Sequence, residues 1–307
     1  MTIPATVPGI SGLPRVRALL VLALALILCA CAATTPTPAY HVPSGAQVPP
    51  FAKKPFEPLR REAVVAIALR EWRLFGQPVD DEPPDTRPPP LPQDKPERQE
   101  GYWQRVAEYW WTGLDPNEKE AAWTGKHDEW GAVFPADQDG YYAWSAAFVS
   151  YVMRIAGAGD GFPYSKNHAT YINIAKQMAD GTTTGYVIRA QRPSAYAPQL
   201  GDLICTGRGP SANLKYDDLP TSASFPAHCD IVVKIDPGQL SVLGGNVDDA
   251  VTMKHIPVTP QGMLATPDGT VLDTRYPWMV VLQVLYPPSA PEIAETGRRT
   301  LTASSAP

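Results

Sequence analysis

The chain has 307 residues, a formal net charge of −5 and a pI near 5.6. No cluster of basic residues stands out, which argues against nucleic-acid binding and against a polybasic patch that binds membranes. We therefore expect no nucleic-acid partner.

The N-terminus predicts a lipoprotein signal peptide over residues 1–31. Arginines precede an unbroken apolar run at residues 18–28, which is too short to span a bilayer comfortably. The small residues that follow, together with Cys31, have the pattern of a lipobox, in which the cysteine is lipidated and becomes the mature N-terminus. Because Ala32 rather than aspartate follows, we expect an outer-membrane lipoprotein that faces the periplasm and contacts the membrane only through its lipid. The alternative is a plain secretory signal cleaved one or two residues later.

Removal of the signal leaves about 276 residues, enough for a core that folds without a cofactor. Residues 32–58 are rich in Pro, Thr, Ala and Ser, which predicts a disordered tether. Residues 288–307 are predicted to form a disordered tail. The segment between them, residues 59–287, is expected to form the folded domain.

Apolar spacing predicts the first helices of this domain. Residues 59–75 carry an apolar stripe every three or four positions, which indicates a helix whose stripe faces the core. The proline-rich segment 78–96 is predicted to be a stiff loop that forms neither helix nor sheet ladder and acts as a spacer rather than a binding segment. Residues 100–113 predict a second helix. Its expected apolar side consists of Trp103, Val106, Ala107, Trp110 and Trp111. These rings suit a core, although aromatic surfaces also stack on sugars.

The rest of the domain changes from helical to strand patterns. Residues 144–154 predict a buried helix that stops at glycines, and residues 171–178 predict a short helix. Strands are expected at residues 202–205, 229–235, 239–243 and 278–285. Helices followed by strands indicate an α+β domain, with helices packed on one face of a small antiparallel sheet.

Ser145, His228 and Asn246 are the first candidates for a catalytic site. Ser145 begins a predicted helix, where the macrodipole and free backbone N–H groups favour a developing anion. His228 opens a predicted strand and is the candidate base, while Asn246 follows the next strand and is the candidate group that orients the imidazole.

A family resemblance supports this choice. The segments that carry it are Trp144-Ser145-Ala146-Ala147-Phe148-Val149, Pro198-Gln199-Leu200-Gly201-Asp202-Leu203-Ile204, His228-Cys229-Asp230-Ile231-Val232-Val233 and Gly244-Gly245-Asn246. Their order resembles the CHAP and NlpC/P60 peptidoglycan hydrolases. The segment from Trp144 to Phe148, together with that from Phe162 to His168, is similar to the DUF2272 family of bacterial envelope proteins.

The resemblance implies a papain-like fold and hydrolysis of amide bonds in peptidoglycan, which would make peptidoglycan or its peptides the partner. The hydrolase families have cysteine at the position of Ser145. A serine hydroxyl depends far more on its base than a thiol does. Two interpretations follow: Ser145 is a working nucleophile, or the fold is inactive and binds cell wall or an envelope partner. A third is that Ser145 simply caps the helix.

Five further residues complete the candidate set. Cys205 and Cys229 lie on predicted strands. Two cysteines in an oxidising periplasm either pair or stay buried, and a cross-strand disulfide here would contribute about 3 kcal/mol. Asp230 lies two positions after His228 and therefore projects from the same face, where it could orient the imidazole or bind a substrate amine. Trp144 and His168 are candidates to line the cleft or bind substrate, although a surface or capping role is the more common one for a histidine such as His168.

Metal and lipase chemistry are disfavoured. No His-Glu-x-x-His motif or paired-cysteine spacing indicates a metal site, and no Gly-x-Ser-x-Gly elbow indicates an α/β-hydrolase. The residues Asp248 and Asp249 are predicted to form a turn.

Overall fold

The computed structural model describes residues 57–287 except 85, 87 and 89. The predicted signal peptide with Cys31, nearly all of the tether and the C-terminal tail lie outside the described residues. Among the helices that are described, none is long and apolar enough to cross a membrane.

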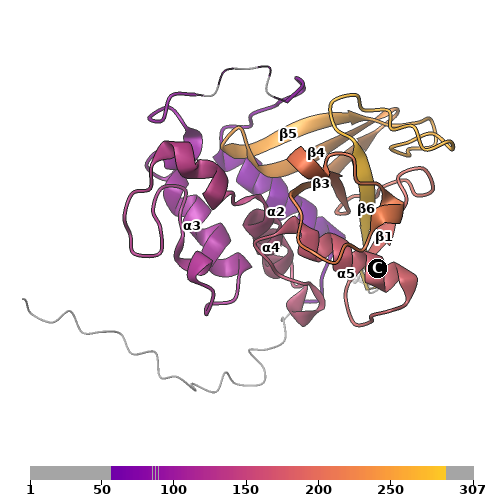
Figure 1. Cartoon of the computed structure of the whole chain (residues 1–307), viewed down its shortest axis with the longest axis horizontal. Helices are drawn as coiled ribbons and strands as arrows, with labels where there is room; N and C mark the ends of the chain where they lie inside the picture. The colour runs from indigo at the N-terminus through magenta and orange to yellow at the C-terminus, as the bar shows by residue number, and fades with distance from the viewer. Residues whose placement is uncertain (1–56, 85, 87, 89, 288–307) are drawn as a thin grey trace, which may run out of the picture. The chain divides into compact units, whose positions relative to one another are not determined.

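Helices occupy the N-terminal half of the described chain and one further segment (Figure 1). The α-helices are α2 (Arg61–Leu74), α3 (Tyr102–Gly113), α4 (Ser145–Ile155) and α5 (His168–Asp180). Short 3₁₀ turns are η2 (Pro96–Arg98), η3 (Lys119–Ala122), η4 (Ala136–Tyr142), η5 (Gly159–Gly161), η6 (Gly209–Ser211) and η7 (Tyr216–Asp218). The four α-helices confirm the predicted ones, and α5 begins three residues earlier than expected.

A six-stranded antiparallel sheet completes the domain, in the order β1-β6-β2-β3-β4-β5. Its strands are β1 (Ile188–Gln191), β2 (Leu203–Gly207), β3 (Ala227–Asp236), β4 (Gln239–Val247), β5 (Ala250–Pro257) and β6 (Trp278–Val284). The helices α2 and α4 pack against β3 and β4, and α5 packs against β1. The protein is therefore an α+β domain, as the order of elements predicted.

Two apolar cores lie on the two faces of the sheet. The larger one contains the buried faces of the helices, including Trp110, Trp144 and Phe148. The smaller one contains Val232 and Trp278. Because neighbouring residues of a strand point to opposite faces, β3 contributes to both cores.

The buried faces of α2 and α3 differ from the predicted stripes. In α3 the buried positions include Val106 and Trp110, but Trp111 is 62% exposed, so its assignment to the core was wrong. In α2 the buried face includes Glu71, which accepts hydrogen bonds from Arg105 (Nε to Oε2, 2.6 Å) and Tyr109 (2.8 Å). A buried carboxylate needs such partners. Because Glu71 is polar, the search for apolar residues did not include it in the buried face of α2.

The proline-rich segment is a loop with one sheet contact. Val79 forms a parallel bridge with Met253 on β5. The carbonyl of Pro78 accepts from the N–H of Met253 (3.0 Å), and the N–H of Asp80 donates to the carbonyl of Met253 (2.9 Å). The prediction that this segment makes no ladder contact is wrong here, because a proline lacks a donor but keeps its acceptor.

The predicted disulfide is confirmed. Cys205 on β2 and Cys229 on β3 face each other directly in the register and are bonded, with Cα atoms 4.1 Å apart. Both lie in the larger core. The predicted turn is confirmed as well, since Asp248 and Asp249 have φ angles of 51° and 57° in the two-residue connection between β4 and β5.

Candidate active site

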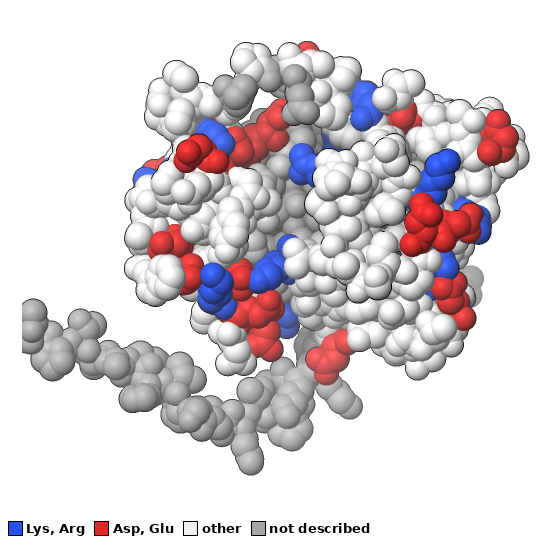
Figure 2. All heavy atoms as spheres, viewed as in Figure 1, with Lys and Arg blue, Asp and Glu red and all other residues white. Residues whose placement is uncertain are grey.

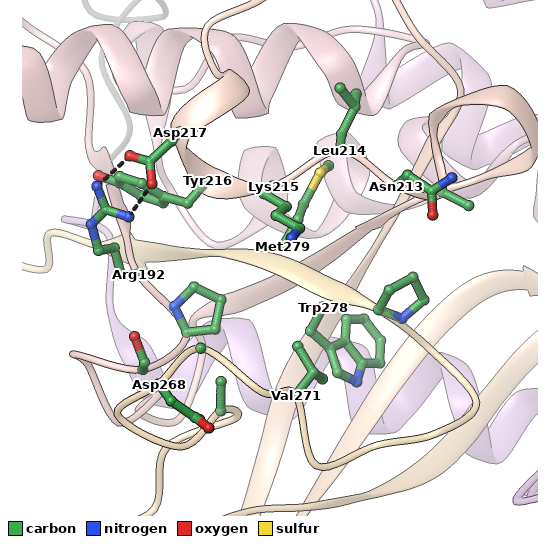
Figure 3. A pocket seen from close by; sticks show the side chains of 16 residues that line it. Arg192, Asn213, Leu214, Lys215, Tyr216, Asp217, Asp268, Val271, Trp278 and Met279 are labelled. Carbon is green, nitrogen blue, oxygen red and sulfur yellow. Dashed lines mark hydrogen bonds and ion pairs between the residues drawn. The ribbon is translucent and has the colours of Figure 1, made fainter.

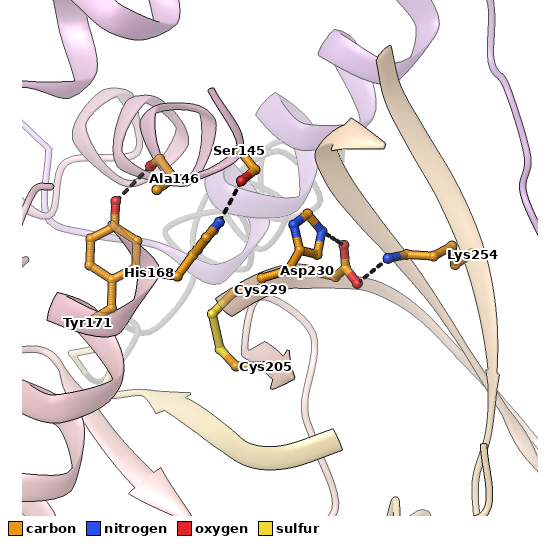
Figure 4. Close-up of a disulfide and its surroundings, with 9 residues drawn as sticks. Ser145, Ala146, His168, Tyr171, Cys205, Cys229, Asp230 and Lys254 are labelled. Atoms are coloured by element: carbon orange, nitrogen blue, oxygen red, sulfur yellow. Dashed lines mark hydrogen bonds and ion pairs between the residues drawn. A yellow bond between two sulfur atoms is a disulfide. The ribbon is translucent and has the colours of Figure 1, made fainter. Parts of the chain in front are cut away.

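Ser145 is the first residue of α4 and is 6% exposed. Its Oγ atom lies 2.8 Å from Nε2 of His168 (Figure 4). The first N–H groups of a helix have no acceptor within the helix, and the helix dipole is positive at this end. The hydroxyl therefore lies where a negative charge on a neighbouring atom would be stabilised.

His168 is the first residue of α5, so two helix N-termini meet at this contact. A buried hydrogen-bond network holds them together. The hydroxyl of Tyr171 donates to the carbonyl of Ala146 (2.6 Å) and also bonds Ser150. The hydroxyl of Ser150 also accepts from the N–H of Ser165 (3.2 Å), just before α5. This network fixes the position of His168 relative to Ser145.

A second imidazole lies beside the first. The rings of His168 and His228 are 5.4 Å apart between centroids and inclined by 62°. On β3, Nε2 of His228 lies 2.9 Å from Oδ1 of Asp230. The other carboxylate oxygen, Oδ2, lies 2.7 Å from Nζ of Lys254 on β5. The result is a buried chain from imidazole to carboxylate to ammonium.

In this array of His228, Asp230 and Lys254, the charges are balanced by direct contact between the side chains rather than by water. Asp230 is fully buried and Lys254 is 1% exposed. Burial alone would raise the pKa of Asp230, but the charge of Lys254 and the hydrogen bonds from His228 and Lys254 outweigh it and hold that pKa far below its usual value. The carboxyl group is therefore ionised and accepts the N–H of His228.

Both histidines are neutral at pH 7. Burial lowers the pKa of His168 well below 6.5, and the neighbouring His228 lowers it further. Burial also lowers the pKa of His228, although Asp230 opposes the shift. Because neutral His228 carries its proton on the nitrogen that faces Asp230, its Nδ1 holds a lone pair. Among the described residues, the Nδ1 atoms of both rings have no hydrogen-bond partner.

Two glycines of β4 make room for this arrangement. A Cβ atom at Gly244 would lie 2.1 Å from Oδ1 of Asp230 and 2.8 Å from Nε2 of His228. A Cβ atom at Gly245 would lie 2.6 Å from Phe148, which packs α4 on the sheet. Side chains at these positions would displace the carboxylate, the imidazole or the helix. The Gly-Gly pair is thus a sequence signal for the site.

The predicted triad is only partly assembled. The imidazole bonded to Ser145 belongs to His168, and the side chain that holds His228 is that of Asp230, whereas the prediction named His228 and Asn246 for these roles. Asn246 has a left-handed backbone (φ 56°) within an irregularity of the β4–β5 pairing and lines a cavity together with His228. An irregular strand changes the direction of its side chains, which spacing along the sequence does not reveal.

Trp144 does not line the cleft as expected. It is fully buried, it contacts Phe75 and Tyr109 in the core, and its Nε1 donates to the carboxyl group of Glu97 (2.5 Å). Its burial fixes the backbone directly before Ser145.

One cavity opens beside His228, and a second cavity adjoins it. One has a volume of about 340 Å³ and is lined by His228, Asn246, Lys254, Arg208, Arg275 and Tyr276, among others. The other has a volume of about 580 Å³, and Arg192 and Asp217 form an ion pair at its wall (Figure 3). Ala212 and Pro277 line both cavities. On the face shown in Figure 2, positive and negative side chains alternate without a large patch of one sign.

Carboxylates that could bind a metal ion gather elsewhere. Oxygen atoms of Glu97, Asp139 and Asp249 lie within 4.8 Å of one another. Lys95 and Arg98 already pair with Asp139, and Nζ of Lys95 lies 3.5 Å from Asp249. Burial, followed by the charge of Asp249, raises the pKa of Glu97 to about 8. These side chains balance one another's charges.

Lys254 was not among the predicted residues, and neither was the strand that carries it. The segment Ala250–Pro257 does not alternate strictly between apolar and polar residues, because Lys254 and His255 are adjacent. The signal in the sequence was the turn at Asp248 and Asp249, which predicts that the segment after it returns as a strand paired with β4.

Comparison with known proteins gives one match. No curated protein and no solved structure matches the chain. The family described as "Uncharacterized protein conserved in bacteria (DUF2272)" matches residues 97–284, which include Ser145, His168, His228 and Asp230. Because this match covers more than half of the chain, the protein belongs to the DUF2272 family.

Proposed function

We propose that this protein is a serine hydrolase with a papain-like arrangement, in which Ser145 cleaves amide bonds in the peptide part of the bacterial cell wall. The observation that carries the proposal is the 2.8 Å contact between Oγ of Ser145 and Nε2 of His168 at the start of α4. A hydroxyl in contact with a neutral imidazole is the basic unit of serine catalysis.

The first half of the reaction follows from this contact. Oγ of Ser145 attacks the carbonyl carbon of the amide while its proton moves to Nε2 of His168. The oxyanion of the tetrahedral intermediate faces the free N–H groups of the first turn of α4. The C–N bond then breaks, and the proton on His168 moves to the leaving nitrogen, which departs as an amine and leaves an ester on Ser145.

The second half returns the enzyme to its starting state. Water attacks the ester carbon and gives a proton to Nε2 of His168. The ester C–O bond breaks, the carboxylic acid leaves, and the proton moves from His168 to Oγ of Ser145. We assign to His228 the positioning of this water from the cavity, because Asp230 orients its ring and its Nδ1 lone pair is available to water or to substrate.

The substrate class rests on the sequence. The four segments that resemble CHAP and NlpC/P60 hydrolases favour cell-wall peptide, and the lipobox at Cys31 would place the enzyme on the periplasmic side of the outer membrane. The α4 helix, with its nucleophile at the N-terminus and its packing against β3 and β4, is consistent with a papain-like fold.

The test is digestion of purified sacculi. The protein, its Ser145→Ala variant and a control variant with the exposed Ser222 changed to alanine are incubated with sacculi, and released fragments are identified by mass spectrometry. The proposal predicts fragments from the wild type and from Ser222→Ala, and none from Ser145→Ala. The masses of the fragments identify which bond is cleaved. Equal release by all three proteins would contradict the assigned nucleophile.

A second candidate function is an inactive fold that binds cell wall or an envelope partner. The low exposure of Ser145 (6%), His168 (4%) and His228 (4%) favours it, because substrate has little access to these atoms. This candidate predicts no fragments from any variant, with wild type and Ser145→Ala sedimenting equally with sacculi.

A further inference from the structure

We propose that Arg208 recognises a carboxylate group of the substrate in the 340 Å³ cavity beside His228. The inference rests on the proposed function, because it assigns the charge of the substrate near the reacting bond. Arg208 directly follows β2 and lines this cavity together with His228 and Asn246.

Among the described residues that line this cavity, Arg208 is the cation that remains available to a ligand. Lys254 is paired with Asp230 (2.7 Å). Arg275 is paired with Asp273 (Nε to Oδ1, 2.9 Å) and also donates to the carbonyl of Asp81 (2.7 Å). The side chain of Arg208 is exposed and has no hydrogen bond or ion pair to any of the described residues.

The backbone around Arg208 is held firmly while its side chain is free. Its N–H donates to the carbonyl of Pro226 (3.0 Å), and its carbonyl accepts from the N–H of Ser211 (3.0 Å). A Cβ atom at Gly207 would lie 1.9 Å from the carbonyl oxygen of Ser211, so the turn leaves no space for a side chain there. A fixed backbone reduces the ordering cost when the guanidinium binds an anion.

The site lies within electrostatic reach of the reacting groups. Beyond the larger effect of burial, the charge of Arg208 contributes to the lowered pKa values of His168 and His228. An anion bound by Arg208 would lie in the cavity that His228 lines. Asp80 and Asp248 also line the cavity, which disfavours a polyanion. We therefore expect a peptide that presents one carboxylate here, bound to the guanidinium group through two parallel hydrogen bonds.

Binding to the full-length Ser145→Ala protein tests the inference separately from hydrolysis. The probe is the soluble disaccharide-peptide fraction that lysozyme releases from sacculi, used as the free acid and after conversion of its carboxyl groups to carboxamides. Affinity is measured by calorimetry for Ser145→Ala alone, with Arg208→Gln added and with Arg189→Gln added. Arg189 is an exposed arginine of β1 outside both cavities and serves as the control.

We expect Arg208→Gln to weaken binding of the free acid roughly tenfold or more, as for a charge-assisted contact. Amidation should weaken binding to the Ser145→Ala protein similarly but have little further effect once Arg208 is replaced, and Arg189→Gln should change nothing. Equal affinities with and without Arg208, or no binding of either probe, would overturn the inference. Binding with these differences, but no fragments from sacculi, would overturn the hydrolase proposal alone.

Discussion

Oγ of Ser145 and Nε2 of His168 lie 2.8 Å apart across a sequence separation of 23 residues, and each residue is the first of its helix. The positive ends of two helix dipoles therefore converge on one hydrogen bond. That potential stabilises an oxyanion next to Ser145 and opposes a positive charge on His168. The same geometry thus favours a neutral base and an anionic intermediate.

Replacement of the two histidines should separate their roles. We expect His168→Gln to lower kcat by roughly 10²- to 10⁴-fold, the usual contribution of a general base. His228→Gln should also lower kcat, because it removes the second neutral imidazole. The control is His127→Gln, since His127 lies outside both cavities and bonds Thr124 (3.1 Å). Fragment release from sacculi is the measurement, and an unchanged rate in His168→Gln would exclude it as the base.

The pH dependence of activity follows from the neutral histidines. The pKa values of His168 and His228 are lowered from 6.5, so both imidazoles are already deprotonated at that pH. We expect kcat/KM to be level above pH 6.5 and to fall only as the pH decreases below it. A profile that falls between pH 8 and 7 would show that the base is not one of these buried rings.

The pH dependence of stability has the same origin. In the unfolded chain a histidine gains its proton near pH 6.5, whereas the buried rings resist protonation. Their contribution to the free energy of unfolding is therefore present above pH 6.5 and is lost as the pH falls from 6.5 toward the lowered pKa values. Urea unfolding between pH 7.5 and 4.5 measures this loss. The double variant His168→Gln/His228→Gln should lose less stability over that range than the wild type.

The buried ion pair makes Lys254 a sensitive position. Lys254→Met leaves the ionised Asp230 without its cation, and such a change costs roughly 3–5 kcal/mol of the free energy of unfolding. Lys234→Met is the matched control, because Lys234 pairs with Asp236 (2.8 Å) but its side chain is 66% exposed. An exposed pair contributes about 0–1 kcal/mol. Urea titration of both variants gives the comparison, and equal losses would contradict the importance of burial.

Gly244→Ala should damage the site more than the fold around it. Its Cβ atom would meet the carboxylate of Asp230 and the imidazole of His228, so we expect loss of activity as that hydrogen bond is displaced. Gly140→Ala is the control, because a Cβ atom there meets nothing within 4 Å. Fragment release and the chemical shifts of His228 are the measurements. An active Gly244→Ala protein with unchanged shifts would contradict the steric argument.

Local patterns were sufficient for much of this protein. The 3.6-residue period located the four α-helices, because an apolar face must be buried wherever a helix packs on a sheet. Alternation in β3 correctly placed Asp230 on the same face as His228, and it left Cys229 on the opposite face to pair with Cys205. These relationships depend only on the geometry of a single element or of one pair of strands.

The partners across elements were decided by the tertiary structure. The helix α5 begins at His168 rather than three residues later, and this start brings that imidazole to Ser145. The β4–β5 hairpin brings Lys254 to Asp230, and the irregular pairing at Asn246 leaves that residue away from its predicted role. The sequence by itself determined the four α-helices, the strands β2, β3, β4 and β6, and the residue types available for chemistry. Which serine meets which histidine depends on how the helices and the sheet pack, because hydrogen bonds act over about 3 Å whereas the residues that make them are separated by tens of positions.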